Sequence, residues 1–300
     1  MPDSPKLPTP VVLGTATPGG GFPLYGNAFA DIVNAAEPTL RVEPRHTKGS
    51  TENVPLLEAG ELDIALVQGE VAHEALSGIG RPPADLRILC AMYSTAGMFV
   101  VRADSPYRCI DDLRGHRIAF GAKGSGLVIL ARNVLDGLGL DQAGDFDAVY
   151  LDRAGDGPAM VLEGQVAALW GGGVGWPGFT AVSQSEPGAR FIAPGPDEIT
   201  RILQRHAFLR PLTVPAGVYR GQHAPISSVG SWSFVLARPS LEASVAYRLA
   251  RALHVCEQKF GEVLDQARET TAANTIGATP SIDRLHLGVQ LYFRESGLLT

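Results

Sequence analysis

The sequence has 300 residues, a length that suits two domains or one large domain. Its 25 Lys and Arg residues against 31 Asp and Glu give a formal charge of −6, which argues against nucleic acid as a partner. Apolar residues make up 45% and charged residues 19%, unlike a disordered chain, and the longest aliphatic run, 127–131, is far shorter than the roughly 20 residues of a membrane-spanning helix.

The N-terminal segment differs from an export signal. Residues 1–13, MPDSPKLPTPVVL, carry one lysine and four prolines and have no apolar core of the kind that a secretory signal needs. Either a leader has been trimmed or none existed.

The first third of the chain alternates strands and helices. A short buried strand is predicted at 11–15, followed by the glycine-rich turn ATPGGG and a helix that opens at Pro23. A strand at 40–42, a helix with Ser50 as its N-cap and Gly60 as its stop, and a strand at 62–68 follow.

This order recurs from residue 116 onward, with the strand HRIAFG, the turn AKGSG and a further helix. Gly20 and Gly124 are 104 residues apart, as are Gly60 and Gly164, which predicts two similarly built α/β lobes. Alternating strands and helices favour mostly parallel sheets covered on both faces, with ligands bound at the carboxyl ends of the strands.

Two apolar strands, 98–102 and 231–237, bracket the second lobe and are candidate hinges. Lobe 1 is then expected to comprise residues 1–100 with 232–300, and lobe 2 residues 101–231. Helices predicted at about 241–259 and 282–296 would complete lobe 1.

Catalytic and metal-binding motifs are scarce. The seven histidines have no metal-ligand spacing, Ser125 does not lie in G-x-S-x-G, and the Walker A pattern is absent. The three cysteines are far apart and could form one bridge at most. Gly173, Gly175 and Gly178 fit the dinucleotide pattern G-x-G-x-x-G, a weak match at this glycine content. The prediction is a protein without enzyme activity, cofactor or metal.

Glycine turns supply the strongest indication of a binding site. Gly19, Gly20 and Gly21 precede one helix and Gly124, Ser125 and Gly126 another, so backbone N–H groups and two helix dipoles could face an anion. Each turn alone is more often a plain strand-to-helix connection, but the shared offset favours a common role.

Several side chains near these turns have two interpretations. Ser50 could cap its helix or donate to a ligand, and Asn53 could point into the same opening or simply be exposed. Gln68 ends a strand where its amide could contact a ligand or only start a loop. Phe22 and Trp170 could form aromatic walls, although core packing is the default for tryptophan.

Five segments resemble the TAXI class of solute receptors of tripartite ATP-independent periplasmic (TRAP) transporters: GTATPGGGFPLYGNAFADIVN (14–34), KGSTENVPLLEAGELDIALVQGEVA (48–72), VVRADSPYRCIDDLRGHRIAFGAKGSG (100–126), VPAGVYRG (214–221) and LHLGVQLYFRESG (285–297). The resemblance spans about 11–297. Gly69, Leu287 and Val289 depart from the usual residues of that class.

The resemblance implies a type II periplasmic-binding fold, in which two parallel or mixed sheets flanked by helices form two lobes joined by hinge strands. The lobes would close on a small organic anion and then dock on membrane permease subunits. The ligand-facing positions it implies are Thr15, Gly19, Gly20, Gly21, Phe22, Ser50, Asn53, Gln68, Gly124, Ser125, Gly126, Trp170, Gly171 and Gly172.

The sequence therefore predicts an extracytoplasmic receptor for a dicarboxylate, a 2-oxoacid or an acidic amino acid, such as 2-oxoglutarate or glutamate. Lys48, Lys123 and Arg153 are candidate charge partners of the ligand. Two alternatives stay open: a cytosolic sensor or enzyme on the same fold, which the missing leader favours, and a dinucleotide-dependent oxidoreductase.

Overall fold

The computed structural model describes residues 7–300. Its first part alternates strands with helices, as expected: β1 (Thr9–Gly14), α1 (Gly21–Ala36), β2 (Leu40–Arg45), α2 (Ser50–Glu58), β3 (Ile64–Val67), α3 (Gly69–Ser77) and the long β4 (Arg87–Arg102). The middle of the chain continues with β5 (Arg117–Ala122), α4 (Gly126–Gly137), β6 (Asp147–Leu151), α5 (Gly157–Leu162), β7 (Ala168–Gly172), α6 (Pro177–Gln184), β8 (Ala189–Ile192), α7 (Pro196–Arg205) and β9 (Arg210–Val214). The last part comprises β10 (Ile226–Ala237), α8 (Ala243–Val255), α9 (Glu257–Val263), α10 (Ala272–Ala278) and α11 (Leu287–Glu295).

The strands form a mixed sheet in the order β2-β1-β3-β10-β4-β7-β5-β6, with β9 beside β10 and β8 beside β4. The pairs β1–β2, β1–β3, β5–β6 and β5–β7 are parallel, as the alternation of strands and helices predicted. The pairs that β10 makes with β3, β4 and β9, and those of β4 with β7 and β8, are antiparallel. The strand pairing is therefore mixed, which the fold implied by the resemblance allows, and the narrower expectation of mostly parallel sheets is wrong, because β4 and β10 pair antiparallel with their neighbours.

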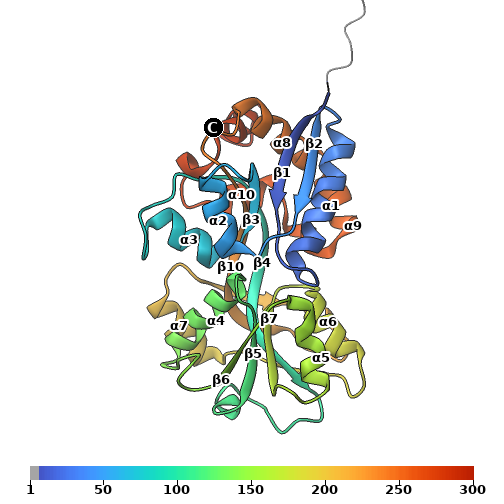
Figure 1. Cartoon of the computed structure of the whole chain (residues 1–300), viewed down its shortest axis with the longest axis vertical. Coiled ribbons are helices and arrows are strands. Elements are labelled where there is room, and N and C mark those ends of the chain that lie inside the picture. The colour runs from blue at the N-terminus through green and yellow to red at the C-terminus, as the bar shows by residue number, and fades with distance from the viewer. Residues whose placement is uncertain (1–6) are drawn as a thin grey trace, which may run out of the picture.

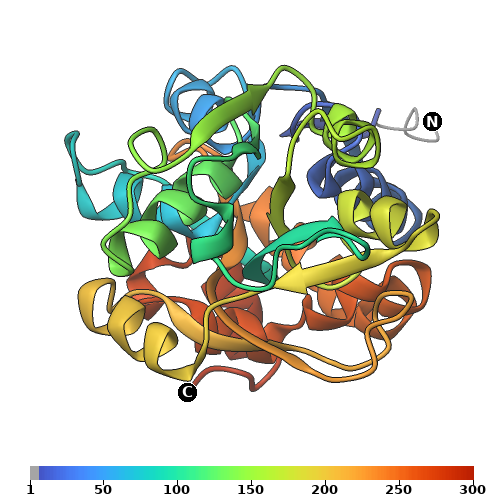
Figure 2. The ribbon, with the colours of Figure 1, turned by 90° about the horizontal axis from the view of Figure 1, so that it is seen from below.

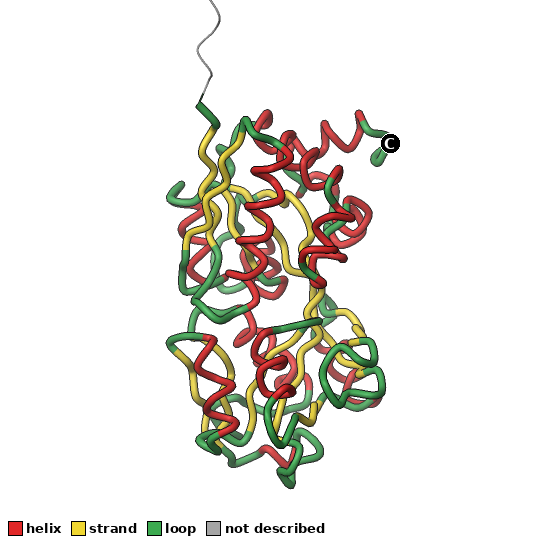
Figure 3. The backbone as a smooth tube through the Cα atoms, turned by 90° about the vertical axis from the view of Figure 1, so that its right-hand side faces the viewer, coloured by secondary structure: helices red, strands yellow, loops and turns green. Residues whose placement is uncertain are grey.

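Two halves lie one above the other in Figure 1, and β4 and β10 run from one to the other. The upper half carries β1–β3 and the C-terminal helices, and the lower half carries β5–β9 with α4–α7. Viewed from the side (Figure 3), strands and helices of each half group together, and from below (Figure 2) helices of the lower half lie on two sides of its strands. The lobe architecture thus follows from two long strands that belong to both halves.

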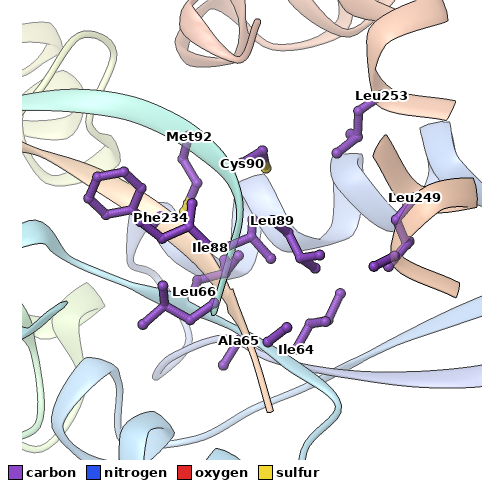
Figure 4. Close-up of a cluster of buried hydrophobic side chains, with 14 of the residues drawn as sticks. Ile64, Ala65, Leu66, Ile88, Leu89, Cys90, Met92, Phe234, Leu249 and Leu253 are labelled. Atoms are coloured by element: carbon purple, nitrogen blue, oxygen red, sulfur yellow. The ribbon is translucent and has the colours of Figure 1, made fainter. Parts of the chain in front are cut away.

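Each half has its own apolar core. The upper core joins the buried faces of β1, β3, α1 and α8 to the first part of β4 and the last part of β10. Figure 4 shows part of this core, with Leu66, Ile88 and Phe234 on three neighbouring strands, Leu249 and Leu253 of α8 at the other side of the view, and Ile64 and Leu89 between them. Two further clusters, which include Phe99, Trp170 and Phe179, fill the lower half.

Several element boundaries differ from the sequence prediction. The helix expected at 241–259 is two helices that meet at Cys256, and the turn places Phe260 of α9 fully inside the core against Tyr25. The expected helix 282–296 begins with a single 3₁₀ turn, and α11 starts after His286, whose ring accepts a hydrogen bond from Gly288 N. Helix α1 opens at Gly21, two residues before Pro23.

Candidate functional site

A cavity with a volume of about 50 Å³ lies between the halves, where β1, β3, β5 and β7 end. Since one water needs roughly 10–15 Å³ by this measure, the space suits a few waters or a small organic molecule. The lining residues are Ala16, Thr17, Gly20, Gly21, Phe22, Lys48, Gly49, Ser50, Gln68, Tyr93, Thr95, Gly121, Ala122, Ser125, Leu127, Ala154, Leu169, Gly172 and Trp176.

Three helices present their N-termini to this cavity. Gly21 and Phe22 open α1, Ser50 opens α2, and Ser125 is the N-cap of α4, so all four residues line the space. The first N–H groups of a helix have no partner within the helix and carry the positive end of its dipole. The cavity is therefore built to hold negative charge on backbone amides.

The basic residues stay at the rim. Among the lining residues Lys48 alone is charged; its side chain is 79% exposed and its Nζ lies 3.9 Å from Glu52 Oε1. Lys123 is exposed beside Asp152, and Arg153 is exposed without lining the cavity. An anion here would meet amides and hydroxyls in the interior and a lysine at the entrance.

The aromatic walls are Phe22, Tyr93 and Trp176, two of which the sequence did not indicate. Tyr93 lies in the middle of β4, where the local pattern shows only a buried strand, and burial raises the pKa of its hydroxyl. Trp176 lies against two glycines: a Cβ on Gly171 or Gly178 would come within 2.5 Å of its ring. Glycines near the end of β7 and in the first turn of α6 thus make room for the indole ring.

Trp170 packs in the core and does not form a wall of the cavity. It is fully buried in the lower core, its Nε1 donates to Leu127 O at 2.9 Å, and its ring meets that of Phe99 edge to face. It does not line the cavity, although Gly172 at the end of the same strand does.

Ser50 is the first residue of α2 instead of its N-cap, which corrects the expected cap. The N-cap is Gly49, with a φ of +118° that favours glycine. The Ser50 hydroxyl accepts a hydrogen bond from Gln68 N at 3.0 Å. This bond places the start of α2 and the end of β3 together on the cavity surface.

Thr15 and Asn53 lie behind the cavity and hold its frame. Asn53 Nδ2 donates to Thr15 O and to Leu66 O, both at 2.8 Å, and Thr15 Oγ1 donates to Arg45 O. Both side chains are buried and neither lines the cavity. They fix the ends of β1 and β3 relative to α2.

Three of the predicted site glycines, Gly19, Gly124 and Gly126, allow the upper and lower halves to come into close contact. A Cβ on Gly19 would lie 2.5 Å from Gly155 Cα, one on Gly124 2.5 Å from Lys48 O, and one on Gly126 2.4 Å from Gln68 Cβ. Each pair joins the upper and the lower half. Gly19 and Gly124 therefore lie at the edge of the cavity without lining it, and we call them the lip residues. Gly126 packs against the Gln68 side chain.

Further contacts join the halves around the cavity. Thr51 N and Oγ1 both donate to Gly124 O, at 3.2 and 3.1 Å, and Ala154 N donates to Thr17 Oγ1 at 3.3 Å. On the far side of α3, Glu74 pairs with Arg132, and the His73 ring stacks on Phe208 at 4.3 Å. The conformation is closed.

The G-x-G-x-x-G segment is not an open phosphate-binding turn. Tyr219 Oη donates to Gly173 O at 2.6 Å and accepts from Trp176 N at 3.0 Å, and α6 begins at Pro177, which has no N–H. The Tyr219 hydroxyl therefore takes up the Trp176 N–H, a hydrogen-bond donor of this turn that a phosphate would need.

Other candidate features carry little chemistry. Across residues 7–300, no group of His, Cys, Asp or Glu could hold a metal ion. Over the same span, none of the helices has the length and apolarity to cross a membrane. The three cysteines, Cys90, Cys109 and Cys256, are free thiols.

Comparison with solved structures shows the same fold. The chain is similar to a structure described as a periplasmic transporter, with a TM-score of 0.64, 13% identity, and 97% of this chain and 98% of that chain covered. A substrate-binding protein of an amino acid ABC transporter matches with a TM-score of 0.53, 13% identity and coverages of 86% and 98%. The alkanesulfonate-binding protein SsuA from Xanthomonas axonopodis pv. citri, bound to MOPS, matches with a TM-score of 0.51, 17% identity and coverages of 97% and 84%.

These likenesses establish the two-lobed α/β fold of periplasmic binding proteins. The sequence profile of the NMT1-like family matches residues 13–297, which is nearly the whole chain. The protein therefore belongs to the NMT1-like family.

Proposed function

We propose that the protein is a solute receptor of the TAXI type, which captures a small organic anion between its lobes and delivers it to the permease subunits of a TRAP transporter outside the cytoplasm. The observation that carries the proposal is the cavity between the halves at the N-termini of α1, α2 and α4. The TAXI-like segments and the membership of the NMT1-like family support it.

The lobes in this proposal are residues 1–100 with 232–300 and residues 101–231, with hinges near 98–102 and 231–237. The switch between the upper and lower cores along β4 and β10 supports these boundaries. Binding would shift an equilibrium between open and closed forms.

The solute class is a dicarboxylate, a 2-oxoacid or an acidic amino acid, such as 2-oxoglutarate or glutamate. Backbone amides at helix N-termini bind carboxylates without a buried cation, and the small volume favours a compact solute. The lining threonines, serines and Gln68 would hydrogen-bond its other polar atoms. No step in this function needs a cofactor.

The test is thermal unfolding of the purified protein with 2-oxoglutarate, glutamate, glutamine, C4-dicarboxylates, NAD and ATP. A ligand at about 100 times its Kd stabilises by roughly 2.7 kcal/mol, which raises the Tm by a few degrees. A shift with a carboxylate and none with nucleotides is the expected result. A shift with a nucleotide alone would contradict the proposal and favour an enzyme.

Two variants of Ser125 then locate the site. Its hydroxyl caps α4 by accepting from Leu127 N at 3.2 Å, so Ser125→Ala loses the cap, at about 1 kcal/mol of stability, and keeps the cavity open. Ser125→Trp loses the same cap and fills the cavity. The tryptophan variant is expected to lose binding while the alanine variant binds; equal affinities would remove the start of α4 from the site.

A further inference from the structure

Glu70 is a buried carboxyl group that the binding function leaves unexplained. It is the second residue of α3, its side chain is fully buried, and neither carboxyl oxygen has a hydrogen-bond partner. Native proteins rarely leave a buried polar group unpaired, so this one calls for an explanation.

Two neighbouring polar groups share this condition. Ser231 Oγ on β10 and Gln68 Nε2 are both buried and unpartnered. Both side chains lower the pKa of Glu70 and so favour its charged form. A Cβ on Gly69 would lie 2.2 Å from Ser231 Oγ, so the glycine at this position leaves room for the hydroxyl. Together, Glu70, Gln68 and Ser231 form a buried polar triad.

The triad touches the cavity through Gln68, which lines it. A charged carboxylate only accepts hydrogen bonds, so it attracts Gln68 Nε2 and leaves Oε1 toward the cavity. A neutral carboxyl can instead donate to Oε1, which turns the NH₂ group toward the cavity. An anionic solute only accepts hydrogen bonds, so it binds better when the NH₂ group of Gln68 faces the cavity.

The charged surroundings of Glu70 are simple. Burial raises its pKa to about 7, and Glu74, one turn further on α3, raises it as well. Strand β10 carries no charged residue, and desolvation lowers the pKa of His73, which favours its neutral form. The other charged residues on the packed helices have their own partners: Arg132 pairs with Glu74, Asp136 with Arg205 and His206, Glu52 with Lys48, and Glu58 with Arg81.

We propose that Glu70 is a positioning residue that sets which end of the Gln68 amide faces the cavity, so that an anionic solute binds the form with a neutral Glu70. This inference rests on the proposed function. Mutual repulsion between the solute and a charged Glu70 acts in the same direction. Solute binding therefore takes up a proton when the pH is above 7.

A measurement without solute tests the triad itself. The side-chain NH₂ resonances of Gln68 in ¹⁵N-labelled protein are expected to titrate with a midpoint near pH 7 in the wild type and to stay constant in Glu70→Gln. Glu163→Gln, which removes an exposed carboxyl group, serves as the matched control and is expected to titrate like the wild type. Gln68 resonances that do not move between pH 6 and 8 in the wild type would overturn the inference, whatever the solute.

Calorimetric titration with 2-oxoglutarate and with glutamate at pH 6 and pH 8 tests the consequence. If only the neutral form of Glu70 binds, the affinity of the wild type falls about tenfold between these pH values. In Glu70→Gln the affinity is expected to be the same at both, and in Glu163→Gln to fall as in the wild type. Binding by the wild type with no pH dependence would overturn the inference and leave the receptor function intact. Loss of all carboxylate binding would instead count against the receptor function, and the Gln68 titration would still decide the role of Glu70.

Discussion

Closure of the lobes over the cavity depends on glycine at position 124. This residue has an ordinary φ, so alanine introduces no backbone strain. Its new Cβ would nevertheless lie 2.5 Å from Lys48 O across the cleft, closer than any real contact. Gly124→Ala must therefore move the lips apart in the closed form, while the open form has nothing to clash with.

The size of this effect follows from the contacts that the shift would break. Gly124 O accepts from both Thr51 N and Thr51 Oγ1. Two partly exposed hydrogen bonds contribute about 1–2 kcal/mol together, a factor of roughly 5–30 in the closing equilibrium. Because the apparent Kd is inversely proportional to the closed fraction, solute affinity should fall by about the same factor.

Calorimetry with the carboxylate that stabilises the wild type measures the affinity, and small-angle scattering with and without it measures closure. Gly277→Ala is the matched control, because a Cβ there meets nothing within 4 Å. We expect Gly124→Ala to bind more weakly with an unchanged Tm in the absence of solute. Affinity equal to that of the control would refute the assignment of this contact to the closing motion.

Three further predictions concern stability and spectroscopy. Asn53→Ala removes the hydrogen bonds to Thr15 O and Leu66 O, although Thr15 O keeps the one from Thr47 Oγ1, and should lower the free energy of unfolding by about 1–3 kcal/mol, measured by urea titration. Burial raises the pKa of Glu70 from 4.5 to about 7 in the folded state, so the free energy of unfolding falls by about 3 kcal/mol as the pH rises from 4.5 to 7. Glu70→Gln should therefore be more stable than the wild type at pH 8 by up to that amount, and equally stable at pH 4.5. The same difference in stability between the two proteins at both pH values, measured by urea titration, would argue against the raised pKa. Trp176→Phe should abolish most of the change in tryptophan fluorescence on solute binding, since Trp176 lines the cavity and Trp170 is fully buried in the core.

The local periodicity of the sequence was sufficient to predict the alternation of strands and helices and the glycine turns. The 104-residue offset joined turns that the structure places on opposite sides of one cavity, because Gly20 and Ser125 both line it. Only the parts 98–102 of β4 and 231–237 of β10 were predicted as strands. The rest of both strands was missed, because nothing in the local pattern shows that they continue from one half into the other. Their antiparallel pairing is a contact between segments more than 100 residues apart, which local patterns do not encode.

The side chains of the candidate site were harder to predict. Asn53 and Trp170 occupy the right region but turn inward, because the orientation of a side chain depends on neighbours that only the fold supplies. Tyr93, Thr95 and Trp176 reach the cavity from other elements. The glycines at 171 and 178 were a usable signal, since glycines on both sides of Trp176 leave room for its ring to pack on the backbone.

A structure of the protein with the stabilising carboxylate bound would test the central claim most directly. We expect a carboxylate group between the lobes, its oxygens about 2.7–3.0 Å from backbone N–H groups at the starts of α1, α2 or α4. A solute held outside this cavity, or one whose carboxylate is bound by lysine or arginine side chains with the helix N-termini empty, would contradict it.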